Sequence, residues 1–170
     1  MSRDFDLADF DAARAEWEAA FASVPDDALG YLRPGDDYAL GGLQVHVNWV
    51  LLHYRRVLAG IVAGRYGRLE PQDPPGEGDE ASRRAMAGLT AGERKRSLDE
   101  MARLHAAVRT AAGKLPEAEW TRQAPVVYGE GEEPYPTSPE ELIGWLRDHY
   151  REHVQQCGDL VGEWSATAAG

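Results

Sequence analysis

The sequence predicts an all-α protein, a four-helix bundle with long crossover loops. Four segments of about 17 to 27 residues place apolar side chains every three to four positions, the spacing of helices with one buried side. No segment alternates apolar and polar residues as a half-buried strand does, and no internal repeat is present. A chain of 170 residues is long enough to bury one core. We therefore expect residues 1–170 to form a single domain.

The first two helices are predicted from their apolar spacing. The first is expected over about residues 7–23, with Pro25 ending it. Its inward residues are Phe10, Arg14, Trp17 and Phe21. Because Arg14 lies among apolar residues, its stem should cover the core while its charged end reaches water. The second helix is expected over about residues 40–64 and is apolar almost all round between 43 and 58, which predicts the most buried element.

The last two long helices are marked by N-terminal caps. Thr90 followed by Glu93 forms a capping-box pattern for a third helix that extends to about residue 115. The residues expected on its inner side are Leu98, Met101, Leu104, His105 and Val108. Residues 138–141 read Ser-Pro-Glu-Glu, which places an N-cap, a proline and a capping glutamate in order. This fourth helix is expected to end near Trp164.

Two long connections separate the later helices. Residues 65–89 carry Pro71, Pro74, Pro75, Gly76 and Gly78 among acidic residues, which predicts a loop without a core pattern. Residues 121–136 predict a second loop, with room for a short hairpin. Loops of this length often carry function, so any ligand cleft is expected near them and the N-terminal part of the fourth helix.

Composition excludes several classes of function. The formal net charge of −11 disfavours a nucleic-acid partner, which is typically recognised by a basic surface. One cysteine cannot form an internal disulfide. The first 20 residues lack the apolar segment of a secretory signal, and no apolar run is long enough to cross a bilayer. We therefore expect a cytoplasmic protein with no membrane partner.

Two histidines occupy the inward side of the fourth helix. His149 and His153 are four residues apart and so lie on one face, one turn apart. The face that contains them comprises Leu142, Leu146, His149, His153, Cys157, Leu160 and Trp164. A buried imidazole must satisfy two nitrogen atoms, and a metal ion satisfies one on each ring at the same time. The pair therefore indicates either core histidines held by hydrogen bonds or two ligands of a divalent ion.

The third ligand is ambiguous from spacing. His46 and His53 lie on one side of the second helix, but about 10 Å apart along its axis, so only one can join the pair. His105 is a weaker candidate on the third helix. Cys157 lies about 12 Å from His149 along the fourth helix, too far for one ion to bind both. We interpret Cys157 as a buried core thiol.

Two motifs resemble the DinB-like (YfiT-like) superfamily of metalloenzymes, which includes mycothiol-dependent maleylpyruvate isomerase and bacillithiol transferase branches. Residues 35–40 read Gly-Asp-Asp-Tyr-Ala-Leu and lead into Val-His-Val-Asn-Trp at 45–49. Residues 148–153 read Asp-His-Tyr-Arg-Glu-His. The family commonly has a Trp-Ser pair where this chain has Tyr38-Ala39. Because Ala39 cannot cap a helix, one of the two aspartates before it is expected to do so.

The resemblance implies that His46, and not His53, joins His149 and His153 in binding a divalent metal ion, often zinc or nickel. It also implies a low-molecular-weight thiol as a second cofactor. His53 would then hydrogen-bond within the bundle or line a pocket.

Three neutral imidazoles with an open fourth position suit metal-assisted chemistry on a small molecule. The resemblance implies a metal-dependent thiol S-transferase or isomerase. Two alternatives compete with it: a metal-dependent hydrolase, and a non-catalytic binding or structural bundle that forms a homodimer.

Overall fold

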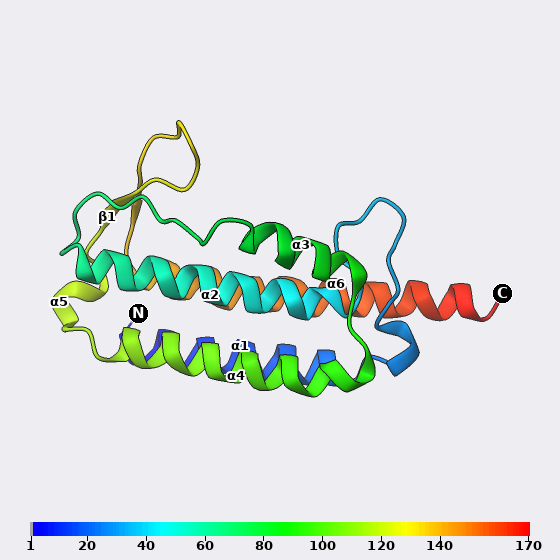
Figure 1. Cartoon of the computed structure of the whole chain (residues 1–170). Helices are drawn as coiled ribbons and strands as arrows, with labels where there is room; N and C mark the ends of the chain where they lie inside the picture. Colours follow the sequence, from blue (N-terminus) through cyan, green and yellow to red (C-terminus); the bar gives the residue numbers. More distant parts are fainter. Residues whose placement is uncertain (1) are drawn as a thin grey trace.

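The computed structural model describes residues 2–170 and confirms the all-α fold. The bundle consists of four long helices, α1 (Arg3–Ala22), α2 (Gly42–Ala63), α4 (Ala91–Gly113) and α6 (Pro139–Ala168) (Figure 1). The shorter elements are the 3₁₀ helix η1 (Asp26–Ala28), α3 (Glu77–Ala87), α5 (Glu117–Trp120) and the strands β1 (Ala124–Val126) and β2 (Tyr135–Thr137). Among the described residues, no helix combines the length and the hydropathy needed to cross a membrane.

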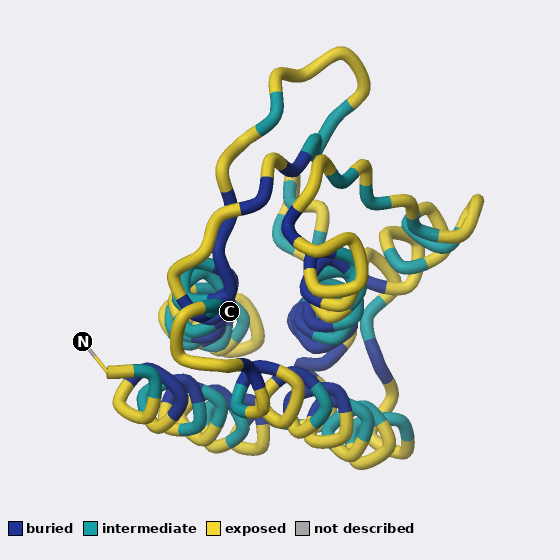
Figure 2. Tube along the Cα trace, turned by 90° about the vertical axis from the view of Figure 1, so that its left-hand side faces the viewer, coloured by how far each residue is buried: buried dark blue, intermediate teal, exposed yellow. Residues whose placement is uncertain are grey.

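The four long helices pack as two pairs. Helix α1 packs most extensively on α6, and α2 on α4. The helices of each pair run in the same direction, opposite to that of the other pair (Figure 1). The connection between α2 and α4 must therefore run back along the bundle, whereas α1 and α2 join at the same end. Buried residues gather where the helices face one another, and the outer sides are exposed (Figure 2).

The core contains the apolar residues that the helical spacing predicts. Phe10, Trp17 and Phe21 are fully buried on α1. Arg14 is half-buried, and its guanidinium pairs with Glu18 at 2.6 Å, as expected for an arginine whose stem covers the core. Of the residues predicted to face inward on α4, all are buried except Leu98, which packs on the edge of the core.

The caps of α4 and α6 form as predicted, but α1, α2 and α6 have different ends. The capping boxes that begin at Thr90 and Ser138 are both present. Helix α1 begins at Arg3, because Ser2 caps a polar first turn that no apolar spacing marks. Helix α6 continues beyond Trp164 to Ala168, because its last turns are exposed and carry no breaker. These are polar turns that hydrophobic periodicity cannot detect.

The predicted aspartate cap of α2 is wrong. No side chain caps this helix, whose N-cap is Gly41. The backbone N–H of Gly41 donates instead to the carbonyl of Leu29 at 2.8 Å. Asp36 accepts a hydrogen bond from Arg33 at 2.9 Å. The helix start is thus fixed by backbone contacts with the preceding connection, and it needs no capping side chain.

Residues 65–89 were predicted to be a loop, and this is wrong for the part that forms α3. The helix has an acidic first turn, which favours helix formation through the helix dipole. Ala85 is its only buried residue, so no apolar spacing marks it. The backbone of α3 lies directly against α2, and a Cβ on Gly42 would lie 1.6 Å from the carbonyl oxygen of Ala85. The absence of a side chain at Gly42 therefore allows this contact.

The loop at 121–136 contains the short hairpin for which its sequence left room. Strands β1 and β2 pair antiparallel, with Ala124 opposite Thr137. Leu69 adds to the hairpin through hydrogen bonds with the backbone of Pro125 and Val127, both 2.9 Å long. The segment after α2 is thereby attached to the hairpin before α6.

The close approach of α3 predicts the effect of one substitution. Gly42→Ala should destabilise the fold by about 1–3 kcal/mol, because the added methyl group overlaps the backbone of α3. The measurement is the free energy of unfolding in urea, monitored by circular dichroism.

Gly158→Ala is the matched control. A Cβ at Gly158, on α6, meets nothing within 4 Å. This substitution should stabilise the fold by about 0.5–1 kcal/mol through helix propensity. Equal effects of the two substitutions would contradict the close contact between α2 and α3.

Candidate metal centre

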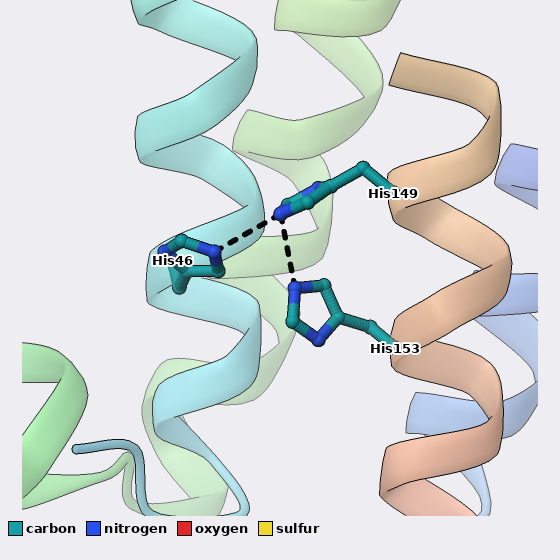
Figure 3. Close-up of side chains that lie close together, drawn as sticks. All are labelled: His46, His149 and His153. Atoms are coloured by element: carbon teal, nitrogen blue, oxygen red, sulfur yellow. Dashed lines mark hydrogen bonds between the residues drawn. The ribbon is translucent and has the colours of Figure 1, made fainter. Parts of the chain in front are cut away.

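The structure brings His46, His149 and His153 together between α2 and α6 (Figure 3). His46 lies in the second turn of α2, and the other two lie on successive turns of α6. The Nε2 atom of His149 is 3.0 Å from Nε2 of His46 and 3.0 Å from Nε2 of His153. One nitrogen from each ring lies within 4.8 Å of the other two.

This spacing suits a single ion. Nitrogen atoms at about 2.0 to 2.1 Å from a tetrahedral metal are about 3.3 Å from one another. A neutral imidazole carries only one N–H group. When three Nε2 atoms face one another, there are therefore fewer N–H groups than lone pairs at their meeting point. A cation would satisfy the lone pairs that have no hydrogen bond. The group contains nitrogen donors and no carboxylate, a set typical of zinc or nickel and not of magnesium or calcium.

Neighbouring side chains hold two of the rings in place. The Nδ1 atom of His153 is 2.8 Å from Oε1 of Gln156. Because an amide oxygen only accepts hydrogen bonds, Nδ1 of His153 donates, and its Nε2 keeps a free lone pair. Tyr38 stacks on the ring of His46, with the ring centroids 4.4 Å apart. The tyrosine that replaces the family's usual tryptophan thus orients one of the three imidazoles.

Burial keeps the three imidazoles neutral. Burial, with a smaller contribution from the nearby ring of His153, lowers the pKa of His46 from 6.5 to about 4 and that of His149 to about 3. Burial also lowers the pKa of His153, although its hydrogen bond with Gln156 opposes this. The neutral imidazole is the form that binds metal, so near pH 7 these rings do not have to lose a proton first.

His53 lies outside this group. Its Nδ1 is 2.7 Å from Oδ2 of Asp73, in the segment between α2 and α3. Arg56 donates to the other oxygen of Asp73 at 2.9 Å. Burial alone would raise the pKa of Asp73, but the hydrogen bonds from Arg56 and His53 outweigh it and lower the pKa. His53 therefore hydrogen-bonds within the fold, one of the two roles expected for it.

His105 and Cys157 also lie apart from the three histidines. His105 bridges Asp11, at 2.8 Å, and the hydroxyl of Tyr150, at 3.1 Å, so both of its nitrogens have partners. Cys157 is buried, as predicted, and burial raises the pKa of its thiol to about 11. A thiol with such a pKa is not a thiolate near pH 7 and has little tendency to bind metal.

A groove opens beside the histidines on the side nearest the hairpin. It has a volume of about 290 Å³, and its lining residues are Val50, Tyr54, Trp145, Asp148, His149 and Glu152. Tyr128 and Tyr135 of the hairpin region extend its aromatic wall, each with its ring centroid 6.0 to 6.2 Å from that of Trp145. The groove thus lies at the N-terminal part of α6, where a cleft was expected.

Sequence reasoning missed three residues of the site. Gln156 follows His153 by three positions, and Trp145 precedes His149 by four. Tyr54 follows His46 by eight, two turns along the same side of α2. These spacings place Gln156 and Trp145 one turn from a histidine and Tyr54 on the same side of α2 as His46, and they could have identified all three.

Comparison with known proteins agrees with this architecture. A family model described as the DinB superfamily matches residues 4–157. The chain belongs to the DinB superfamily. None of the curated proteins matches its sequence. The Tyr38-Ala39 departure leaves the superfamily's fold intact, because Ala39 is fully buried and its N–H bonds to Ala85 of α3.

Two solved structures have the same fold. They are the crystal structures of the mycothiol-dependent maleylpyruvate isomerase and of a histidine-to-alanine mutant of it. Each is 12% identical to this chain, with a TM-score of 0.71, and the match covers 93% of this chain. The chain spans 61% of the length of that enzyme. At this identity the likeness establishes the fold.

Removal of single imidazoles tests the assignment of the ligands. His46→Ala, His149→Ala and His153→Ala should each weaken binding of Zn²⁺ by more than about 100-fold, because each would remove one of the three candidate ligands. Gln156→Ala should weaken it by about 10- to 100-fold, the usual effect of losing the partner that orients a ligand. Isothermal titration of metal-free protein with Zn²⁺ measures both effects. His53→Ala is the control and should leave the affinity for Zn²⁺ unchanged. Loss of Zn²⁺ binding in His53→Ala would contradict the assignment.

The lowered pKa values predict how pH affects the metal-free fold. In the unfolded chain His46 and His149 bind protons near pH 6.5, but in the folded chain only near pH 4 and 3. Between these pH values the unfolded state therefore binds more protons than the folded state. The two neutral histidines contribute fully to stability above about pH 6.5, and this contribution is lost as the pH falls towards 4. Urea unfolding between pH 7 and 4 should show a shallower pH dependence for His149→Leu than for the parent protein. Identical pH profiles would contradict the prediction.

Proposed function

We propose that the protein binds one divalent metal ion, zinc or nickel, through His46, His149 and His153, and catalyses a thiol-dependent transfer or isomerisation of a small molecule. The observation that carries this proposal is the convergence of three neutral Nε2 atoms at one end of an aromatic groove. Among residues 2–170 the group comprises these three side chains alone, which leaves a coordination position for an exogenous ligand. Such an ion, when bound, acts as a Lewis acid and favours the thiolate form of a thiol ligand.

The groove contributes binding and water exclusion. Tyr54 and Trp145 lie with their ring centroids 6.0 Å apart and provide an apolar surface beside His149. Burying the apolar part of a substrate against these rings would displace water from the histidines and strengthen electrostatic interactions there.

Two carboxylates in the groove differ in their availability for proton transfer. Asp148 accepts a hydrogen bond from Arg147 at 2.7 Å and so already has a partner within the protein. Glu152 is exposed and has no ion-pair partner among the described residues. It lies one residue before His153, on the rim of the groove. We assign Glu152 as the acceptor of the proton that the thiol loses on binding.

The comparisons support thiol chemistry over the alternatives. The solved structure with the same fold is, by its own description, a mycothiol-dependent isomerase. A purely structural ion would call for a fourth protein ligand, and the aromatic rings of Tyr54 and Trp145 suit the apolar part of an organic substrate better than water. The proposal also places the protein in the cytoplasm, where small thiols remain reduced, and is compatible with a homodimer.

An assay with small thiols and model electrophiles tests the proposal. Zn²⁺-loaded protein is offered cysteamine, N-acetylcysteine or mycothiol together with 1-chloro-2,4-dinitrobenzene or a cis-enone acid. Turnover should require a thiol and fall to background in His153→Ala. In Glu152→Gln it should fall by about 100-fold or more without loss of bound metal, because general-base catalysis contributes that much.

His53→Ala is the control for turnover, and its rate should equal that of the parent. Cleavage of esters or amides without a thiol would instead identify a hydrolase. No turnover with any pair, in protein that retains its metal, would identify a binding or structural module.

A further inference from the structure

A second and larger cavity lies away from the histidines, between α2, α3 and α4. Its volume is about 540 Å³, within the range of sites for small organic ligands. Its lining residues are Val45, Asn48, Trp49, Leu52, Glu77, Glu80, Ala81, Arg84, Leu89, Glu93, Arg96, Ser97, Glu100 and Leu104. Helix α3 lies over this side of α2 (Figure 1). Because Ala85 is the only buried residue of α3, the helix leaves the cavity unfilled.

This cavity is separate from the candidate metal centre. His46 and Val50 lie four residues apart on the stripe of α2 that faces α6. Val45, Trp49 and Leu52, which line the larger cavity, lie on a different stripe. Among residues 2–170, the two cavities share no lining residue. A ligand could therefore occupy the larger cavity whether or not a metal ion is bound.

The floor of the cavity is apolar. Val45, Leu89 and Leu104 are buried, and the half-buried rings and methyl groups of Trp49 and Leu52 face the open space. Such a surface favours the apolar part of a ligand by the hydrophobic effect, and the indole adds a flat face for stacking.

The glutamates on the rim all have partners. Glu77 pairs with Arg56 at 3.1 Å, Glu80 with Arg83 at 2.5 Å, Glu100 with Arg103 at 2.6 Å, and Glu93 accepts from the backbone N–H of Thr90 at 2.8 Å. Arginines outside the cavity therefore balance the charges of Glu77, Glu80 and Glu100. Glu93 is bound only by the neutral groups of Thr90, so it is the one rim carboxylate whose charge no outside arginine balances.

The two arginines on the rim have no such partner. Within residues 2–170, neither Arg84 nor Arg96 forms an ion pair or a side-chain hydrogen bond. Both lie near Glu93, whose pKa is lowered mainly by its hydrogen bonds with Thr90 and further by these two positive charges. Two guanidinium groups from different helices, α3 and α4, thus reach the same edge of the cavity with their donors unused.

Ser97 adds a neutral donor between them. The side-chain amide of Asn48 donates to the carbonyl and the hydroxyl oxygens of Ser97 at 2.9 and 3.2 Å. Its own oxygen accepts from Gln44 at 2.9 Å. The amide is therefore satisfied within the protein, while the Ser97 hydroxyl keeps its hydrogen for a ligand.

We propose that this cavity is a second binding site, for a small amphipathic organic anion. The carboxylate of the ligand pairs with Arg84 and Arg96, whose planar guanidinium groups suit bidentate contacts with a carboxylate. Its aromatic or aliphatic body lies on Trp49 and Leu52. The apolar floor favours an organic anion over an inorganic one. Two guanidinium groups beside the single unbalanced carboxylate of Glu93 favour an anion over a cation.

The test uses the fluorescent anion 8-anilinonaphthalene-1-sulfonate as the probe, with two competitors of similar shape and opposite charge. 3-Phenylpropionate should displace the probe at least about tenfold better than 3-phenylpropylamine. Arg84→Gln and Arg96→Gln should each weaken 3-phenylpropionate binding by about tenfold, the effect of losing one charge-assisted hydrogen bond. Ala81→Phe should weaken it as well, by filling the cavity from α3.

Two control variants show whether the anion binds in this cavity. Arg55→Gln removes an exposed arginine of α2 that lies outside the cavity and should leave binding unchanged. His149→Ala, tested without metal, should also bind 3-phenylpropionate normally. Loss of binding in His149→Ala would place the anion at the histidines and overturn the proposal. Equal competition by the two phenyl compounds, or unchanged binding in both arginine variants and in Ala81→Phe, would overturn it too.

Discussion

The interface between α2 and α6 contains imidazole rings where a bundle would ordinarily bury apolar side chains. Polar rings at such a position cost stability unless their nitrogen atoms have partners. The bundle therefore obtains its apolar packing elsewhere, between α1 and α6 and between α2 and α4. Phe10, Trp17 and Phe21, all fully buried on α1, provide much of it. The two outer pairings hold α2 and α6 at the separation that three facing imidazoles require.

A buried chain of hydrogen bonds fixes the rotation of α2 within this arrangement. Trp17 of α1 donates to Gln44 at 2.8 Å, Gln44 donates to Asn48 at 2.9 Å, and Asn48 donates to Ser97 of α4 at 2.9 Å. Gln44 is fully buried, so any rotation of α2 that broke these bonds would leave its amide unsatisfied. Because His46 lies between Gln44 and Asn48 in the sequence, the same bonds direct its ring towards α6.

The sequence predicted the features that local patterns determine. Apolar spacing and capping residues located the four long helices, and the four-residue spacing of His149 and His153 placed both on one inward face. The choice of His46 over His53 depended on a family resemblance, because both lie on one side of α2. The structure separates them through Asp73, which binds His53 from a segment whose position no local pattern reveals. Helix α3 was missed for a similar reason, since it buries one small residue and is held by contacts with the backbone of α2.

The segment after α2 is attached to that helix by side-chain contacts. His53 and Arg56 bind Asp73, and Arg56 also binds Glu77 at the start of α3. These contacts fasten the segment to α2. The hairpin extends the wall of the groove, because its half-exposed Tyr135 lies beside Trp145. Helix α2 thus carries two separate cavities. The cavity beside the histidines is bounded by the hairpin. The other is bounded by α3, which the ion pair between Arg56 and Glu77 ties to α2.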